Sequence, residues 1–257
     1  VREFYENKKQ TDIKKDNSYT NIFEGKNVIV IHAESMMTNA MSLKFNGQEV
    51  TPYLNKMANE GMFFSNFYSQ VSVGTSSDSE LTNTTSLMPT KSGTAFVSYY
   101  NRNYISTPSM LKEMGYYPFS MHANNGNAWN RNVTYKYLGY DNFYYYTKDF
   151  EIDEEIGLGL SDKSFFNQSV DIIKEIDSTH ENFYGTLIML TNHTPLSDIE
   201  NYTHYKVDYK YKNESERKTI LAIICVTDEW YERLENDFHL SVFEVATPIR
   251  SIGIGTR

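Results

Sequence analysis

Short apolar runs that alternate with helix-forming segments constrain the fold of this chain most strongly. Residues 27–35 (NVIVIHAES) predict a buried strand that ends in polar residues, and residues 51–62 (TPYLNKMANEGM) predict a helix after it. In that helix Thr51 suits the cap, Pro52 suits the first position and Gly61 suits the end. A strand followed by a helix in this way is the repeating unit of a layered α/β protein.

The alternation continues to about residue 193. Further strands are predicted in residues 62–73, 116–122, 141–147 and 182–193. Further helices are predicted in residues 76–87, 107–115, 130–139 and 161–178, the second of them capped by Thr107 and stopped by Gly115. We therefore expect an α/β fold with three α/β/α layers and a mainly parallel central sheet, in which functional sites lie at the carboxyl ends of the strands.

Composition excludes several classes of protein. A net charge of −9 without a long basic cluster argues against binding to a nucleic-acid backbone. The single cysteine, Cys225, excludes an internal disulfide and a cysteine-rich zinc site. No apolar run approaches the roughly 18 residues that span a bilayer. We expect the polar residues 1–24 to be a linker from a membrane anchor upstream of Val1.

Polar or metal-binding side chains follow three of the predicted strands. Because the ends of parallel strands meet at one edge of a sheet, we expect these groups to converge. They are Glu34 with Ser35, His122 with Asn124, and Asn192 with His193.

The hydroxyl-rich residues 71–89 (VSVGTSSDSELTNTTSLMP) precede or begin a predicted helix. A hydroxyl in the first turn of a helix, next to a divalent cation, loses its proton more easily, because the helix N-terminus and the metal both stabilise an alkoxide. If the helix begins at Ser76 or Ser77, the segment has this arrangement. Taken alone, such a segment is more often a helix cap.

Six motifs in order are more specific than any one of them. They are VIVIHAES, NGQEVTPYLNKMANEGMFFSNFYSQ, SSDSELTNTTSLMP, HANNGNAWNRNVTYKYLGYDNFY, GLSDKSFF and LTNHTPL. Together, over roughly residues 25–200, they resemble the extracellular catalytic domain of the lipoteichoic acid synthase family, in the alkaline phosphatase and sulfatase superfamily.

That resemblance implies a metal-dependent transferase. It would move glycerol phosphate from phosphatidylglycerol to a cell-envelope polymer through a covalent glycerophosphoryl-serine intermediate. The metal would be Mn2+, with Mg2+ as the alternative. The partners would be the lipid, the glycerol phosphate polymer and the membrane surface, and the chain would act on the outer face of the bacterial membrane or be released from it.

The resemblance also implies roles for individual residues. The shared SDSE places Ser76 at the nucleophile position, where the family has threonine, and a slip of one residue would place Thr75 there. Glu34 matches the first metal ligand; without the resemblance, a helix-capping role at a strand end would be favoured. Ser76 would be the second oxygen ligand of the metal.

Four other residues match family positions for substrate. Trp129 and Arg131 of AWNRN match residues that hold glycerol phosphate, and a guanidinium suits phosphate oxygens. His193 of TNHTP matches a histidine that contacts the phosphate or transfers a proton. His122 is a weaker match of the same kind, for which a structural role is the alternative.

The family pattern is incomplete in this chain. No Gly-Asp-His segment, which completes the metal site in the family, is present. Asp228, at the end of the predicted strand TILAIICVTDEW, is the substitute ligand that we considered. We therefore divide the chain into a linker (1–24), the N-terminal part of a sulfatase-like catalytic domain (25–213) and a divergent tail (214–257), so that the C-terminal part of the fold is incomplete.

The sequence is compatible with two other functions. One is a catalytically impaired fragment that retains a glycerol-phosphate pocket, because only part of the metal site is visible. The other is a phosphodiesterase or other hydrolase of the sulfatase superfamily. The C/S-x-P-x-R motif, from which sulfatases make their nucleophile, does not surround Ser76.

Overall fold

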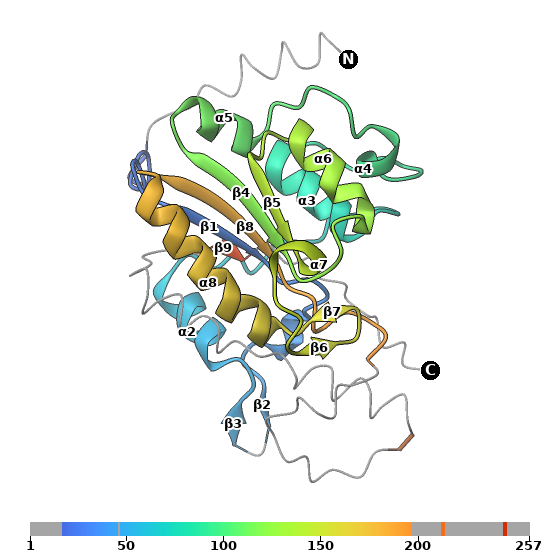
Figure 1. Ribbon diagram of the computed structural model, residues 1–257. Coiled ribbons are helices and arrows are strands. Elements are labelled where there is room, and N and C mark those ends of the chain that lie inside the picture. Colours follow the sequence, from blue (N-terminus) through green and yellow to red (C-terminus); the bar gives the residue numbers. More distant parts are fainter. Residues whose placement is uncertain (1–16, 46, 197–211, 214–243, 246–257) are drawn as a thin grey trace.

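A parallel five-stranded sheet forms the centre of the molecule (Figure 1). The computed structural model describes residues 17–45, 47–196, 212–213 and 244–245. The strand order is β5-β4-β8-β1-β9, and every adjacent pair is parallel. The strands are β1 (Val28–His32), β4 (Tyr117–His122), β5 (Asn142–Tyr145), β8 (Phe183–Ile188) and β9 (Glu244–Val245).

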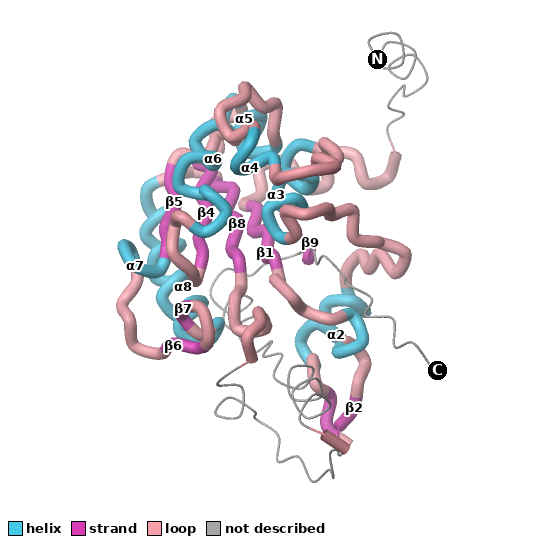
Figure 2. Tube along the Cα trace, turned by 90° about the vertical axis from the view of Figure 1, so that its right-hand side faces the viewer, coloured by secondary structure: helices cyan, strands magenta, loops and turns pink. Residues whose placement is uncertain are grey.

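Pairing in the sheet sets the carboxyl ends of three strands side by side. In β1, His32 pairs with Ile188 of β8, and in β4, His122 pairs with the same Ile188. The residues that follow β1, β4 and β8 therefore leave the sheet at one edge, as the sequence predicted. The strand β9 continues the sheet beyond β1, where Glu244 pairs with Val30 (Figure 2).

Helices cover both faces of the sheet and create two hydrophobic cores. One face packs against α2 (Pro52–Glu60) and α8 (Asp162–Thr179), and the other packs against α3 (Ser76–Thr85), α4 (Ala95–Ser98), α5 (Thr107–Glu113) and α6 (Arg131–Tyr137) (Figure 1). Alternate strand residues enter different cores: Ile29 and Ile31 face α8, and Val30 faces α3. The predicted three-layer α/β/α arrangement is therefore confirmed.

The principal helices follow their sequence signals. In α2 the first residue is Pro52 and the C-cap is Gly61, whereas the Thr51 hydroxyl donates to Ala40 O (3.2 Å) and does not cap the helix. The 18-residue α8 buries one apolar stripe, and Ser161 caps it by accepting a hydrogen bond from Ser164 N (3.0 Å). The remaining elements are short: η1 (Thr38–Ala40), β2 (Lys44–Phe45), β3 (Gln48–Glu49), η2 (Ala128–Asn130), α7 (Tyr146–Asp149), β6 (Glu155–Ile156) and β7 (Gly159–Leu160).

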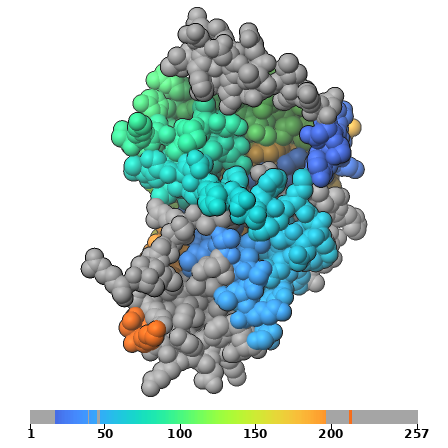
Figure 3. All heavy atoms as spheres, turned by 180° about the vertical axis from the view of Figure 1, so that it is seen from behind, coloured from blue at the N-terminus to red at the C-terminus, as the bar shows by residue number. Residues whose placement is uncertain are grey.

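Two local predictions were wrong. Residues 62–73 form no strand, and aromatic side chains such as Phe64 and Tyr68 are 65% and 71% exposed. No strand of the described residues pairs with this segment. Its atoms, coloured blue to cyan, lie at the surface in Figure 3. The cap of α5 is Ser106, not Thr107, because the Ser106 hydroxyl accepts the Ser109 N–H (3.2 Å).

Several predictions fall partly or wholly outside the described residues. Residues 17–25 form turns, but residues 1–16 of the predicted linker and most of the predicted tail (214–257) are not described. Among the residues that the structure does describe, no helix is both long enough and apolar enough to cross a membrane.

Candidate active site

Ser76 is the first residue of α3, and an unusual turn presents it. Thr75 precedes it with φ 43° and ψ −106°, a conformation that costs a non-glycine residue free energy. The Thr75 side chain makes no capping hydrogen bond to the helix. The turn directs the Ser76 hydroxyl toward Glu34, which follows β1.

Glu34 receives the hydroxyl of Ser76. It lies two residues beyond β1, is 3% exposed, and its Oε1 accepts a short hydrogen bond from Ser76 Oγ. The other carboxylate oxygen, Oε2, is buried and has no hydrogen-bond partner among the described residues. Burial of an unpartnered carboxylate oxygen is unfavourable, so this atom would gain from a bound cation.

His193 joins this pair from the end of β8. Its Nε2 lies 3.7 Å from Glu34 Oε1, and about a third of its side chain (34%) is exposed. Its Nδ1 lies 2.5 Å from Thr194 O. Because a carbonyl oxygen only accepts, the proton of the neutral ring lies on Nδ1, and Nε2 remains available to accept one. Ser76, Glu34 and His193, far apart in sequence, therefore meet at the carboxyl edge of the sheet.

Asp162 fixes the backbone that carries His193. It is the first residue of α8, and its Oδ1 accepts the N–H groups of Leu190 (2.7 Å) and Thr191 (3.2 Å). In return, the Thr191 hydroxyl accepts the N–H of Asp162 (2.8 Å). Burial raises the pKa of the Asp162 carboxyl to about 6, and these hydrogen bonds oppose the rise.

Arg131 forms a buried ion pair with Glu80 of α3. The guanidinium is 1% exposed; its Nη2 lies 2.5 Å from Glu80 Oε1, and its Nε lies 3.1 Å from both carboxylate oxygens. Tyr135 donates its hydroxyl to Glu80 Oε2 (2.5 Å). The paired charges hold Arg131, the first residue of α6, in one orientation against α3.

His122 completes the surroundings of Arg131. It is buried at the end of β4, with Nε2 3.0 Å from Arg131 Nη1 and Nδ1 3.2 Å from Ile188 O. Burial and the positive charge of Arg131 lower the pKa of His122 well below its usual value. A neutral ring with its proton on Nδ1 donates to Ile188 O and accepts from Arg131, so both nitrogens are used within the protein.

Trp129 lies in η2, two residues before Arg131, and its backbone conformation is strained. Both Trp129 (φ 54°) and Asn130 (φ 60°) have positive φ. The Asn130 side chain donates to Phe96 O (2.9 Å), which holds this turn against α4. Trp129 is half-buried and packs against the core between the sheet and α3, so the turn presents it near the N-terminus of α6.

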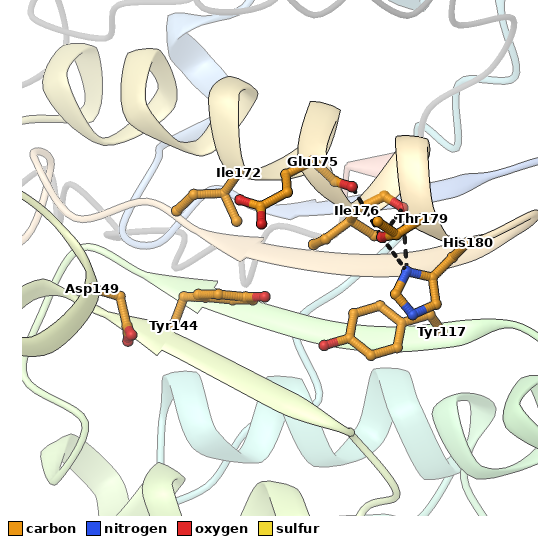
Figure 4. A pocket seen from close by; sticks show the side chains of 8 residues that line it. All are labelled: Tyr117, Tyr144, Asp149, Ile172, Glu175, Ile176, Thr179 and His180. Carbon is orange, nitrogen blue, oxygen red and sulfur yellow. Dashed lines mark hydrogen bonds between the residues drawn. The ribbon is translucent and has the colours of Figure 1, made fainter.

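His32, the last residue of β1, lies close to Glu80 and Tyr135. It is buried, its Nε2 has no hydrogen-bond partner among the described residues, and burial lowers its pKa. Together with Glu80 and Tyr135 it lines a small cavity. A second cavity, of about 350 Å³, lies between α8 and strands β4 and β5 (Figure 4). None of the candidate site residues lines that second cavity, where the rings of Tyr117 and His180 stack 4.0 Å apart.

Sequence reasoning did not find two buried acids that organise the site. Glu80 lies in the motif SDSEL, and Asp162 begins α8. The available signal was an acid among residues that are expected to be buried. Such an acid indicates a nearby partner, because buried carboxylates need one. The partners themselves, such as Arg131 for Glu80, lie 51 residues away and could not be read from spacing.

The site supplies oxygen donors for a metal but not a complete set. Glu34 Oε2 and Ser76 Oγ suit a hard divalent cation. Within the described part of the chain, no group of three or more His, Cys, Asp or Glu side chains could hold a metal ion. Asp228, the predicted substitute ligand, lies outside the described residues.

Comparison with known proteins assigns the fold to a family. The model of the sulfatase family matches residues 26–240. The match runs beyond residue 213, where we expected the resemblance to end, and it covers the whole described site.

Individual relatives within this family are lipoteichoic acid synthases. Lipoteichoic acid synthase 1 of Bacillus subtilis (strain 168) is 40% identical over 179 residues, which are 68% of this chain and 28% of that protein. Lipoteichoic acid synthase of Staphylococcus saprophyticus is 40% identical over 200 residues, 75% of this chain and 30% of that protein. The crystal structure of the lipoteichoic acid synthase LtaP from Listeria monocytogenes superposes with a TM-score of 0.79 at 27% identity, and it covers 87% of this chain and 55% of that one. The chain thus spans less than a third of the length of the two synthases that it matches in sequence.

Proposed function

Because the chain belongs to the sulfatase family and is a lipoteichoic acid synthase-like member of it, we propose that it transfers glycerol phosphate from a phosphatidylglycerol-type lipid. The acceptor would be a glycerol phosphate polymer of the cell envelope, reached from the outer face of the membrane. The observation that carries the proposal is the contact between Ser76 Oγ and the buried, half-partnered Glu34. A hydroxyl at a helix N-terminus, held on a carboxylate, is set for nucleophilic attack.

The reaction consists of two displacements at phosphorus. Ser76 Oγ gives its proton to a neighbouring base, forms a bond to the phosphorus of the lipid, and the bond from phosphorus to the diacylglycerol oxygen breaks. Diacylglycerol leaves with a proton. In the second step a hydroxyl of the acceptor attacks the glycerophosphoryl-serine and frees Ser76. Each step exchanges one P–O bond for another, so no oxidant or reductant is needed.

His193 is the group that we assign to proton transfer. Its Nε2 lies 3.7 Å from Glu34 Oε1 and would accept a proton, and about a third of the side chain is exposed. It can therefore receive the proton of Ser76 or of the acceptor, and supply one to the leaving oxygen. Trp129 would form a wall for the glycerol. Arg131 is 1% exposed and already held by Glu80 and His122, so it would act on the phosphate through the shape of the site and not by direct contact.

A divalent metal fits one side of this site. Glu34 Oε2, which lacks a partner, and Ser76 Oγ would be its oxygen ligands, and it would stabilise the alkoxide of Ser76 and the phosphate charge. The resemblance suggests Mn2+, with Mg2+ as the alternative, and Asp228 is the third ligand that we propose. Calorimetric titration with Mn2+ tests this directly: we expect binding that Glu34→Ala removes and that Asp228→Ala weakens. Binding that neither change affects would overturn the assignment.

The activity is tested by incubating the purified chain with phosphatidylglycerol vesicles and Mn2+ and measuring diacylglycerol. We expect release that depends on Ser76 and His193, with the Asp177→Ala variant as a matched control at the opposite edge of the sheet. Release of free glycerol phosphate without polymer growth would favour the hydrolase. Lipid binding without release, in the presence of bound Mn2+, would favour the impaired fragment.

A further inference from the structure

The turn before Ser76 is held by a buried acid that has no assigned role. Asp78, in the first turn of α3, is fully buried. Its Oδ2 accepts the backbone N–H of Ser72 (2.9 Å) and the backbone N–H of Gly74 (2.9 Å). One carboxylate oxygen therefore fastens two amides of the segment that leads to the nucleophile.

The same turn is held from its other side. Gly74 O accepts hydrogen bonds from Ser77 N (2.9 Å) and from Ser77 Oγ (2.8 Å), and Ser77 Oγ lies 2.9 Å from Thr94 Oγ1. Ser77 is fully buried and Thr94 nearly so. Both peptide groups of Gly74 are thus fixed by side chains of α3, and α3 is tied to Thr94, which precedes α4.

Close packing leaves little freedom at Gly74. A Cβ added there would lie 2.4 Å from Asp78 Oδ1 and 2.8 Å from Ser77 Oγ. Only glycine allows the backbone to approach the Asp78 carboxylate closely enough for the two hydrogen bonds. Thr75 follows directly with its φ of 43°, a conformation that persists only where its surroundings enforce it.

We propose that Asp78, supported by Ser77, is a positioning residue that holds Thr75 in its strained conformation and so keeps Ser76 Oγ on Glu34. The proposal rests on the function proposed for Ser76. Without the Asp78 carboxylate, the amides of Ser72 and Gly74 lose their acceptor, Thr75 relaxes, and the Ser76 hydroxyl moves away from Glu34. A displacement of this kind lowers the rate of the chemical step and leaves substrate binding intact, because Asp78 touches no substrate.

Asparagine is the discriminating substitution. Asp78→Asn keeps one oxygen acceptor for the two N–H groups and replaces Oδ1, which has no hydrogen-bond partner among the described residues. Asp78→Ala removes the acceptor altogether. Asp177→Ala is the matched control: Asp177 accepts a hydrogen bond from the Asn27 side chain (3.1 Å) at the amino-terminal edge of the sheet, remote from Ser76 in the fold.

The test compares these variants with bis(p-nitrophenyl) phosphate and Mn2+, measuring kcat and KM separately. We expect Asp78→Ala to lower kcat by about 10²-fold with KM unchanged. Asp78→Asn should recover most of kcat, and Asp177→Ala should leave both constants as they are. An unchanged kcat in folded Asp78→Ala, or equal losses in Asp78→Ala and Asp78→Asn, would overturn the proposal.

Amide hydrogen exchange separates this proposal from the proposed function. If the unaltered chain releases no diacylglycerol from phosphatidylglycerol vesicles, the proposed function fails, and exchange at Ser72 and Gly74 still decides the role of Asp78. Faster exchange at these two amides in Asp78→Ala, restored in Asp78→Asn, supports the proposal; unchanged exchange contradicts it. If Asp78→Ala does not fold, Ser77→Ala serves instead, with faster exchange at residues 72–75 as the supporting result and unchanged exchange as the contrary one.

Discussion

Two polar clusters lie side by side at the carboxyl edge of the sheet and differ in how completely they are satisfied. In the Arg131 cluster (Arg131, Glu80, His122 and Tyr135) every charged group has a partner within the protein and is buried. In the Glu34 cluster (Glu34, Ser76 and His193) one carboxylate oxygen has no described partner and the histidine is partly exposed. The first arrangement stabilises a structure, and the second leaves bonding capacity for a ligand.

The largest expected effect is a loss of activity on changing Ser76 in the Glu34 cluster. Ser76→Ala should lower diacylglycerol release by at least about 10³-fold, because among the described residues only Ser76 donates a hydroxyl to Glu34. Ser76→Thr should retain activity, since it keeps a hydroxyl at the same atom. Thr75→Ala is the control for the alternative register, and a loss there as large as that of Ser76→Ala would move the nucleophile to Thr75.

The next effect concerns stability and belongs to the Arg131 cluster. Glu80→Ala should lower the free energy of unfolding by about 3–5 kcal/mol, because it leaves the guanidinium buried without its carboxylate. Lys44→Ala, which breaks the exposed pair with Glu49, should cost about 0–1 kcal/mol. Urea unfolding measures both. Equal costs would mean that Glu80 and Arg131 are solvated in solution, and the contrast drawn here would not hold.

A pH-dependent effect on stability belongs to Asp162, which holds the backbone that leads to His193 in the Glu34 cluster. The folded-state pKa of about 6 exceeds the usual 3.8, so the unfolded chain loses this proton first as the pH rises. The contribution of the carboxyl to stability is therefore complete below about pH 4 and is lost as the pH approaches and passes 6, by roughly 2–3 kcal/mol. Asp162→Asn should remove this loss, so that the variant gains stability relative to the unaltered chain between pH 4 and 7. A constant difference across that range would contradict the shifted pKa.

The smallest effect on stability belongs to the Glu34 cluster, and its sign is opposite to that of Glu80→Ala. Glu34→Gln should leave the free energy of unfolding unchanged or raise it by about 1 kcal/mol, because it removes a buried charge whose second oxygen lacks a partner. Diacylglycerol release should nevertheless fall steeply. Thermal unfolding without added metal measures the first expectation. A destabilisation as large as that of Glu80→Ala would show that Glu34, like Glu80, is satisfied within the protein.

The sequence predicted the helices and strands better than it predicted the side-chain contacts between them. Periodic apolar runs and glycine or proline signals found the strands β1, β4, β5 and β8 and the principal helices, because these signals are local. The pattern of residues 62–73 failed, since a strand also needs a neighbour, which local sequence does not contain. Motif order brought Ser76, Glu34 and His193 into one hypothesis. The partnerships of Arg131 with Glu80 and of Asp78 with Gly74 depend on tertiary packing and became visible only in the fold.

The central claim is that Ser76 is the residue that carries the glycerophosphoryl group. Peptide mass spectrometry after brief incubation of the chain with phosphatidylglycerol vesicles and Mn2+, quenched in acid, tests it most directly. We predict a mass increase of one glycerophosphoryl group, located by fragmentation on Ser76 and absent from Ser76→Ala. Diacylglycerol release with no modified Ser76, or with the group on Thr75, would contradict the account.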